Sequence, residues 1–379
     1  MTREMNREML LIDGLQYVNW NRDLFEKAQR SGLSTIHVTI AYWENIRETL
    51  ENIGNWNRHF INHADLIMPI HQASDILEAK LLGKVGIIFG FQNCSPIEDD
   101  VKMVQILKQL GVHIMQLSYN NQSLLATGCY EEQDGGITRF GREVIKEMNR
   151  VGMIIDMSHS AEKSTLEAIE ISERPIAITH ANPTFFHAAL RNKSDTVLRA
   201  IGESECMLGF SMYPFHLKNG SDCTLQEFCQ MIGQTAEMIG IDRIGIGSDL
   251  CENWDYSILE WMRSGRWTTG IDHGEGSAAS PSWPRQPNWF AGSKDMLTVA
   301  QGLQDVGFNN TDIEKIMGQN WLLFFEKSFP GSPSNPSGLE KNRLILRRFS
   351  WQKHYVATGL SVSLLIKSLP ITAPTIAEK

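Results

Sequence analysis

Short apolar runs recur along the chain, and segments with helical spacing of apolar residues separate them. The runs are rich in Ile, Val and Met, and several are continuous, which is typical of parallel strands covered by helices. The eight runs that we interpret as strands are Met9–Gly14, Thr35–Ala41, Val85–Phe91, His113–Tyr119, Met153–His159, Pro175–His180, Met207–Tyr213 and Arg243–Asp249. Eight alternations of strand and helix within about 250 residues predict an α/β fold, a (β/α)8 barrel of the TIM type. A doubly wound open sheet is the alternative, but no GxGxxG motif follows the first run.

The segment Gly141–Val151 illustrates the helical pattern. Val144, Ile145 and Met148 share one face at helical spacing, and charged residues occupy the other positions. Gly152 follows at the position where helices commonly end. The segment therefore predicts a helix that packs on a strand of the barrel.

The segment Leu250–Phe290 departs from this alternation. It is long and irregular, and it is rich in Trp, Gly, Ser and Pro. Because it follows the eighth strand, we expect it to lie over the barrel mouth as a lid or specificity loop. Its five indoles are predicted to pack against other residues, so that the segment is not a loose surface loop: Trp254, Trp261, Trp267, Trp283 and Trp289. Helical segments around Lys294–Val306 and Thr311–Phe329 then complete the barrel domain, which we predict to span residues 1–329.

The chain changes character after Phe329. The run PGSPSNPSG has the composition of a linker, and residues 330–379 are predicted to form a poorly ordered tail with one short helix at most. The apolar run Val356–Leu365 within it is too short to span a bilayer.

Composition and charge limit the class of protein. A hydrophobic content of 42% is that of a globular protein, and the net charge of −9 argues against nucleic acid or an anionic membrane as a partner. The six cysteines form no CxxC pair, which favours reduced thiols. The first residues, MTREMNREMLLIDG, lack the apolar run of a signal peptide. The expectation is a soluble, cytoplasmic protein.

Two histidines at the ends of consecutive predicted strands are the strongest chemical signal. His159 ends the run MIIDMSH and His180 ends PIAITH, so both imidazoles should lie at the carboxyl edge of a parallel sheet, where α/β folds place their active sites. The pair is more often a metal-binding or catalytic pair than a structural one. His37 and His113, within or at the start of strands, are interpreted as structural. Most of the remaining histidines, such as His216, lie in polar or mixed segments and are expected at the surface or in loops.

Two charged residues lie close to the same edge. Asp249 ends the run RIGIGSD and should face the barrel mouth, where Gly245 and Gly247 leave room for a substrate; the alternative is a helix-capping role. Arg191 follows His180 by eleven residues and could hold a carboxylate with two hydrogen bonds; a solvated arginine before a helix is equally compatible with the spacing.

Several long blocks resemble the membrane (renal) dipeptidases, a family of metal-dependent barrel hydrolases. The blocks are RFGREVIKEMNRVGMIIDMSH, PIAITH, RNKSD, GIGSD and KIMGQNW, and they occur in the family's order and spacing between about Met9 and Phe329. The resemblance implies that His159 and His180 bind zinc and that Arg191 holds the terminal carboxylate of the substrate. It also implies that Asp249 binds metal and handles the proton of the attacking water.

The same resemblance exposes departures from the family pattern. Family members carry a metal-binding His and Asp after the first strand, where this chain has Leu15 and Tyr17. The bridging glutamate of the family corresponds to Gln92, and a histidine that polarises the scissile carbonyl corresponds to Tyr119. With too little negative charge between two cations, a binuclear centre is not expected.

What remains is a site for one zinc ion on His159 and His180, completed by Gln92, Asp249 or water, with a metal-free pocket as the alternative. Tyr119 is then expected to contact the substrate and to polarise its carbonyl group. The resemblance and the frequency of two-fold dimers also favour a homodimer, although no segment marks an interface.

Three functions follow from this set of residues. The preferred one is a dipeptidase-like hydrolase that cleaves a dipeptide or a small amino-acid derivative. The second is a remodelled member that performs different chemistry on a small carboxylated metabolite. The third is a non-catalytic binding barrel, against which the acid Asp249 beside two histidines argues.

Overall fold

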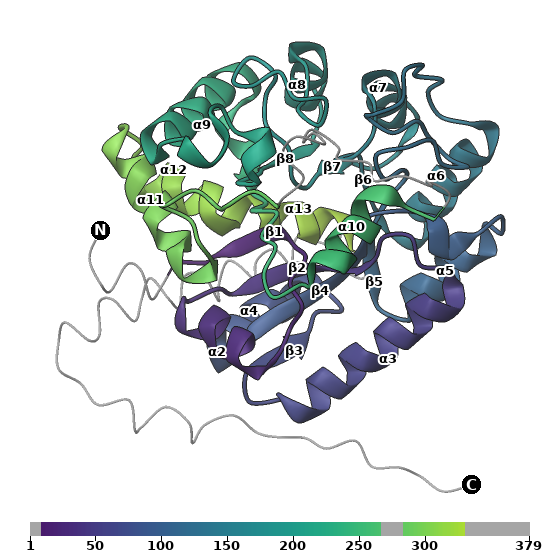
Figure 1. Cartoon of the computed structure of the whole chain (residues 1–379), viewed down its shortest axis with the longest axis horizontal. Coiled ribbons are helices and arrows are strands. Elements are labelled where there is room, and N and C mark those ends of the chain that lie inside the picture. Colours follow the sequence, from purple (N-terminus) through teal and green to yellow (C-terminus); the bar gives the residue numbers. More distant parts are fainter. Residues whose placement is uncertain (1–8, 267–282, 330–379) are drawn as a thin grey trace, which may run out of the picture. The chain divides into compact units, whose positions relative to one another are not determined.

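A computed structural model describes residues 9–266 and 283–329 (Figure 1). Its described part contains one sheet of nine parallel strands. The strands are β1 (Ile12–Gln16), β2 (Thr35–Ala41), β3 (Ile67–Pro69), β4 (Val85–Phe91), β5 (Val112–Gln116), β6 (Ile154–Asp156), β7 (Ala177–Ile178), β8 (Met207–Phe210) and β9 (Ile244–Ile246). All eight predicted strands are present, most of them shorter than predicted. The short strand β3 has no counterpart among the predicted strands.

The strands follow the order β1-β2-β4-β5-β6-β7-β8-β9, and β3 pairs with β4 outside this path. A parallel bridge between Gln16 and Leu250 joins the first strand to the chain after the last. The amide of Tyr17 donates to Leu250 O, and the amide of Asp249 donates to Leu15 O, each at 3.0 Å. The predicted (β/α)8 barrel is therefore confirmed, with its seam between β1 and β9 held by these bonds.

Helices surround the strands in Figure 1. Those described are α2 (Arg22–Arg30), α3 (Ile46–Asn62), α4 (Ala73–Leu82), α5 (Lys102–Gln109), α6 (Arg139–Val151), α7 (Glu162–Ile171), α8 (Asp195–Gly202), α9 (Leu225–Ile239), α10 (Tyr256–Ser264), α11 (Met296–Asp305), α12 (Asn310–Glu314) and α13 (Asn320–Ser328). Helix α6 matches the predicted segment, and it ends at Gly152 with a left-handed φ of 70°. Side-chain caps begin several helices; Thr138, for example, accepts a hydrogen bond from the amide of Gly141.

Trp321 of α13 fills part of the barrel interior. The indole is fully buried, and its Nε1 donates to Ile246 O at 2.8 Å. A Cβ atom at Gly14, Gly209 or Gly245 would lie within 3.0 Å of the indole. These glycines on β1, β8 and β9 thus allow a tryptophan from the end of the domain to pack against the first and last strands.

The expectation that Gly245 and Gly247 leave room for a substrate is therefore wrong. The space beside Gly245 is occupied by Trp321, and a Cβ atom at Gly247 would lie 1.7 Å from Thr179 O. Both glycines allow close packing inside the protein. His37 has the structural role expected for it: its Nδ1 lies 2.6 Å from Gly14 O, and burial lowers its pKa to about 4.

The segment after β9 contains helix α10, which crosses in front of the strands in Figure 1. Aromatic residues of this segment pack as predicted: the Trp254 indole donates to Tyr17 O at 2.8 Å, and the Trp261 ring lies 6.3 Å from that of Tyr42. Trp283 and Trp289 also contact aromatic neighbours, whereas Trp267 lies outside the described residues. The described part of the segment is thus packed on the barrel.

The chain divides into two compact units, Met1–Ser332 and Pro333–Lys379, and all described residues belong to the first. The predicted linker and tail at residues 330–379 lie outside the described residues. Within the described ranges, every helix is too short or too polar to cross a bilayer.

Candidate active site

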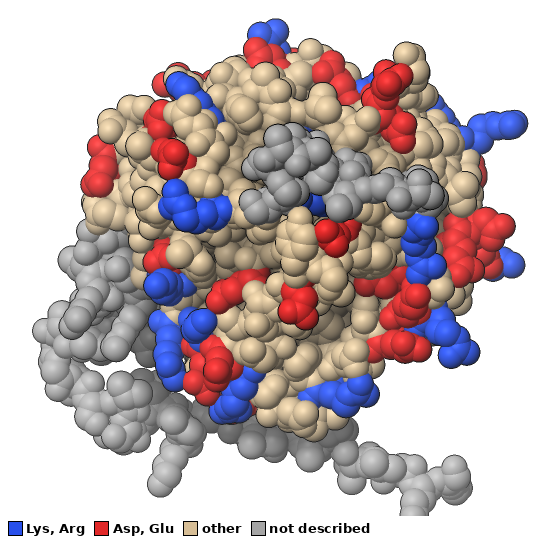
Figure 2. Space-filling view, viewed as in Figure 1, with Lys and Arg blue, Asp and Glu red and all other residues tan. Residues whose placement is uncertain are grey.

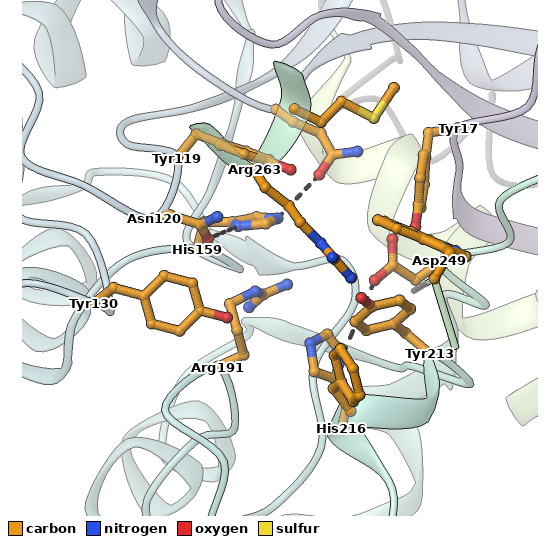
Figure 3. Close-up of a pocket in the computed structure, with 14 residues that line it drawn as sticks. Tyr17, Tyr119, Asn120, Tyr130, His159, Arg191, Tyr213, His216, Asp249 and Arg263 are labelled. Atoms are coloured by element: carbon orange, nitrogen blue, oxygen red, sulfur yellow. Dashed lines mark hydrogen bonds and ion pairs between the residues drawn. The ribbon is translucent and has the colours of Figure 1, made fainter. Parts of the chain in front are cut away.

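Most of the predicted site residues follow strands on the same edge of the barrel. They come one to three residues after a strand: Gln92 after β4, Tyr119 after β5, His159 after β6, His180 after β7 and Asp249 after β9. Five of the six predicted residues line one cavity of about 510 Å³, counting the space at its open mouth: Gln92, Tyr119, His159, Arg191 and Asp249 (Figure 3). The sixth, His180, is fully buried against His159.

The two imidazoles face each other through the same ring nitrogen, since Nε2 of His159 lies 3.1 Å from Nε2 of His180. The other nitrogen of His159, Nδ1, lies 2.6 Å from Asn120 Oδ1, an acceptor, so Nδ1 carries the proton. Burial, reinforced by the positive charge of Arg191, lowers both histidine pKa values well below their usual range. Neutral His159 therefore presents a lone pair at Nε2.

His180 has the same tautomer for a different reason. The Thr179 hydroxyl donates to Asp156 Oδ2 at 2.5 Å, so it accepts from His180 Nδ1, which lies 2.8 Å away. The second oxygen of Asp156 accepts from the amide and hydroxyl of Ser158 and from the amide of Thr179. The buried Asp156 carboxylate thus orients both turns that carry the histidines. Residues that hydrogen-bond around a metal site commonly orient metal-binding imidazoles in this way.

With these tautomers, Nε2 of each histidine carries a lone pair and no proton, and a third lone pair lies beside them. The third belongs to Gln92, whose amide nitrogen donates to Thr39 Oγ1, so that its Oε1 faces His159 Nε2 at 3.0 Å. Gln92 Oε1 and His180 Nε2 thus lie 3.0 Å and 3.1 Å from His159 Nε2, and the three residues could hold a single cation. Within the described ranges, no group of three or more His, Cys, Asp or Glu side chains is placed to hold a metal ion, so the residues do not fit a binuclear centre.

Asp249 lies across the pocket from His159 in Figure 3. Its backbone is left-handed (φ 58°), and its side chain is buried. Burial raises the pKa of this carboxyl to about 7; Arg191 opposes the shift, and the charges of Asp13 and Asp156 add to it. Asp249 is therefore partly deprotonated near neutral pH and can take up or release a proton.

Tyr119 and Arg191 flank the histidine pair. The Tyr119 ring stacks on His159 with 4.2 Å between centroids, and burial followed by the charge of Asp249 raises its pKa well above 10. Arg191 donates from Nη1 to Ser158 O and from Nη2 to His180 O, the latter at 3.2 Å. The guanidinium thus joins the two turns that carry the histidines and also faces the cavity (Figure 3).

His216 was expected at the surface or in a loop; it lies in the connection after β8, but its side chain is buried. The short 3-10 helix Pro214–His216 after β8 turns the side chain inward, where only 2% of the residue is exposed. Its Nδ1 lies 2.8 Å from Ser211 Oγ and 4.0 Å from Asp249 Oδ2. In the sequence, the only indication that His216 belongs to the site was its position six residues after β8. The direction of its side chain is decided by the turn.

The remaining lining residues were not predicted as a set. They are mostly aromatic, with one further arginine: Tyr17, Asn120, Tyr130, Tyr213, Phe215, Met262, Arg263 and Trp283. Tyr17 occupies a position where the family resemblance implies a metal ligand, and its burial raises the phenol pKa well above 10. It therefore contributes a neutral hydroxyl and an aromatic face to the cavity.

Comparisons with known proteins identify the family of the chain. Residues 16–258 match the family described as Membrane dipeptidase (Peptidase family M19). The chain is 26% identical over 207 residues to Dipeptidase tcpJ of Claviceps purpurea (strain 20.1), a match that covers 54% of this chain and 49% of that protein. The chain thus spans about half the length of the curated relatives it matches.

Solved structures resemble the chain over more of its length. An amidohydrolase from Pseudomonas aeruginosa is 34% identical, with a TM-score of 0.80, over 86% of this chain and 98% of that one. A structure described as dipeptidase AC shares the fold, with a TM-score of 0.71 at 16% identity over 85% of this chain and 99% of that one. The barrel, the histidine pair at its carboxyl edge and the family match together show that the chain belongs to the membrane dipeptidase family, peptidase family M19.

Proposed function

We propose that the chain is a metal-dependent hydrolase that cleaves the peptide or amide bond of a dipeptide or a small amino-acid derivative. The observation that carries this proposal is the convergence of lone pairs from His159, His180 and Gln92 beside a buried acid with a pKa of about 7. One zinc ion held by these three residues would supply Lewis acidity toward the substrate carbonyl and would lower the pKa of bound water.

Asp249 acts as the general base. It accepts a proton from the attacking water as the water oxygen bonds to the carbonyl carbon, and it returns this proton to the leaving nitrogen when the C–N bond breaks. A pKa of about 7 suits both steps, because the group gains and loses the proton near neutral pH. The nearest ring nitrogen of His216, Nδ1, lies 4.0 Å from Asp249 Oδ2, which is beyond hydrogen-bond distance.

Tyr119 and Arg191 position the substrate. The raised pKa keeps Tyr119 protonated, so its hydroxyl donates a hydrogen bond to the carbonyl oxygen as negative charge develops there. Arg191 uses the N–H groups that face the cavity to hold the terminal carboxylate. Asp249, considered from the sequence as a metal ligand as well, lies across the pocket from His159 and is proposed as the base alone.

The metal content of the purified protein tests this function together with His159→Ala. We expect about one zinc per chain in the unsubstituted protein and little in His159→Ala, with amide hydrolysis lost in parallel. His63→Ala, a partly buried histidine next to α3, is the matched control and should keep both. Full hydrolysis by a metal-free protein, or by His159→Ala, would contradict the zinc assignment.

A further inference from the structure

Lys193 is a buried lysine that the mechanism above does not use. Lysines ordinarily lie at the surface, and on the face shown in Figure 2 basic side chains are interspersed with acidic ones. Lys193 is instead only 3% exposed. Burying an amino group away from water costs free energy unless its protons are bonded, so the partners of this side chain indicate what it contributes.

The side chain of Lys193 connects the two ends of one turn. Its Nζ atom donates to Met157 O at 2.9 Å and to Ser160 O at 2.8 Å. These two residues begin and end the turn after β6, which the amide of Ser160 closes by donating to Met157 O at 3.2 Å. His159 is the third residue of this turn. The lysine thus holds the backbone on both sides of a proposed metal ligand.

The backbone of Lys193 is itself held in place within the loop after β7. Its amide donates to Asn182 O at 2.8 Å, and its carbonyl accepts from the amide of Thr184 at 2.9 Å. A parallel bridge also pairs it with Pro183, and the next residue, Ser194, is the N-cap of α8. The side chain therefore reaches the turn after β6 from an anchored position on the neighbouring connection.

The two other carbonyl groups of the turn also accept hydrogen bonds from outside it. Ser158 O accepts from Arg191, and His159 O accepts from the amide of Cys129 at 2.9 Å. Arg191 and Lys193 thus hold parts of the same turn, but they differ in one respect. Arg191 is among the described residues that line the cavity, and Lys193 is not. Lys193 can therefore affect the site through the backbone that carries His159.

We propose that Lys193 is a positioning residue for His159: by holding both ends of the turn, it keeps His159 Nε2 directed at His180 and Gln92. The inference rests on the proposed function for the metal that these three residues would share. Their atoms lie 3.1 Å and 3.0 Å from His159 Nε2, so a small displacement of the turn would disturb the set. Without the lysine, the buried carbonyl groups that it bonds would lose a donor, and the turn would shift to recover one.

Lys80 provides a matched control. Its Nζ atom likewise donates to a backbone carbonyl, Met9 O, at 2.8 Å. Met9 precedes β1 and therefore lies at the amino end of that strand, whereas the site lies at the carboxyl ends. Loss of either lysine removes hydrogen bonds to backbone carbonyls, but only Lys193 bonds to the turn that carries His159.

Zinc affinity, measured by competition with a chelator, is the first test. Lys193→Met keeps an unbranched side chain of similar length but removes the donor. It should weaken zinc binding about tenfold to hundredfold, the usual effect of losing a residue that orients a metal ligand. Lys80→Met should change the affinity less than about twofold. Equal affinities for the two variants would overturn the inference.

Nuclear magnetic resonance of the metal-free protein, labelled with 15N-histidine, is the second test and needs neither metal nor hydrolysis. The ring-nitrogen signals of His159, assigned with His159→Gln, should shift in Lys193→Met and stay unchanged in Lys80→Met. If Lys193→Met does not fold, Lys193→Gln takes its place in both tests, because its shorter side chain keeps a polar group in the buried position.

The two tests also separate this inference from the proposed function. A loss of zinc affinity without shifted His159 signals would overturn the inference, because the loss would then arise elsewhere. Shifted His159 signals in a protein that neither binds zinc nor hydrolyses dipeptides would leave the positioning role of Lys193 standing and refute the proposed function.

Discussion

Asp249 combines three unusual properties at one position. Its backbone is in the left-handed region, its side chain is buried, and the pKa of its carboxyl is raised to about 7. Asp tolerates left-handed backbone better than most residues, and Asp249 comes three residues after the end of β9. Burial disfavours the charged carboxylate more than the charge of Arg191 favours it, so the buried group costs stability, as functional groups in active sites commonly do.

This cost predicts that Asp249→Asn stabilises the folded protein by an amount that depends on pH. In the folded state the carboxyl has a pKa of about 7, above the value of 3.8 for an unburied aspartate. The folded state therefore binds more protons between these values, and stability falls as pH rises through this window. Asn does not titrate. At pH 8 the free energy of unfolding of the variant should therefore exceed that of the unsubstituted protein by an amount on the order of 1–4 kcal/mol.

Thermal unfolding in the presence of a chelator at pH 4 and pH 8 measures this difference. At pH 4 the two proteins should be similarly stable, because the carboxyl is then largely protonated. Asp99→Asn, at an exposed turn position, provides the control and should show no such trend. A stability difference that is the same at both pH values would argue against a raised pKa at Asp249.

At the scale of elements, the turns after the strands hold the site more firmly than the strands do. Strand β7 has only two residues, Ala177 and Ile178. His180 is nevertheless fixed, because Thr179 bonds to Asp156 and the amide of His180 donates to Ser158 Oγ at 3.2 Å. The side-chain hydrogen bonds of two neighbouring turns thus replace a longer ladder of strand bonds.

Gly247 is the position at which this packing is most sensitive. A Cβ atom there would lie 1.7 Å from Thr179 O and 3.5 Å from the Cα atom of His180. We expect Gly247→Ala to destabilise the fold by about 1–3 kcal/mol or more, and to weaken metal binding, because the backbone that carries His180 must shift.

Gly54→Ala is the matched comparison, since a Cβ atom there meets nothing within 4 Å and Gly54 lies in the middle of α3. It should stabilise the protein by about 0.5–1 kcal/mol through helix propensity. Urea denaturation of the two variants measures both effects. Similar stability changes for the two substitutions would show that the contact with Thr179 is unimportant.

At the scale of the whole molecule, Trp321 links the end of the domain to its beginning. The indole lies against β1, β8 and β9 and donates a hydrogen bond to Ile246 O. Backbone hydrogen bonds also hold the seam between β1 and β9, such as the one from the Asp249 amide to Leu15 O. The closure of the barrel therefore depends on a side chain distant in sequence from the first strand.

Trp321→Ala should accordingly lower the free energy of unfolding by about 3–5 kcal/mol, the usual cost of removing a buried tryptophan. Leu323→Ala on the same helix is the control, since Leu323 is 50% exposed. Its effect should stay within about 0.5 kcal/mol. Chemical denaturation followed by circular dichroism measures both, and a cost for Trp321→Ala as small as that of the control would contradict a central role for the indole.

The sequence by itself determined the order of the eight barrel strands and the residues that follow them, but not the short strand β3. Apolar runs of strand length, helical spacing and the glycine after α6 are local signals, so they are readable without a structure. The parallel barrel then requires Gln92, Tyr119, His159, His180 and Asp249 to share one edge, because the carboxyl ends of its strands all point the same way.

Only the tertiary structure decided which atoms face each other. The inward direction of His216, the filling of the space beside Gly245 by Trp321, and the entry of Arg263 into the pocket depend on contacts between distant segments. The tautomers of the two metal-binding candidates likewise follow from Asn120 and Thr179, whose roles no local pattern indicates. Sequence periodicity specifies which face of an element is buried, whereas the partner on that face is fixed by packing across the whole barrel.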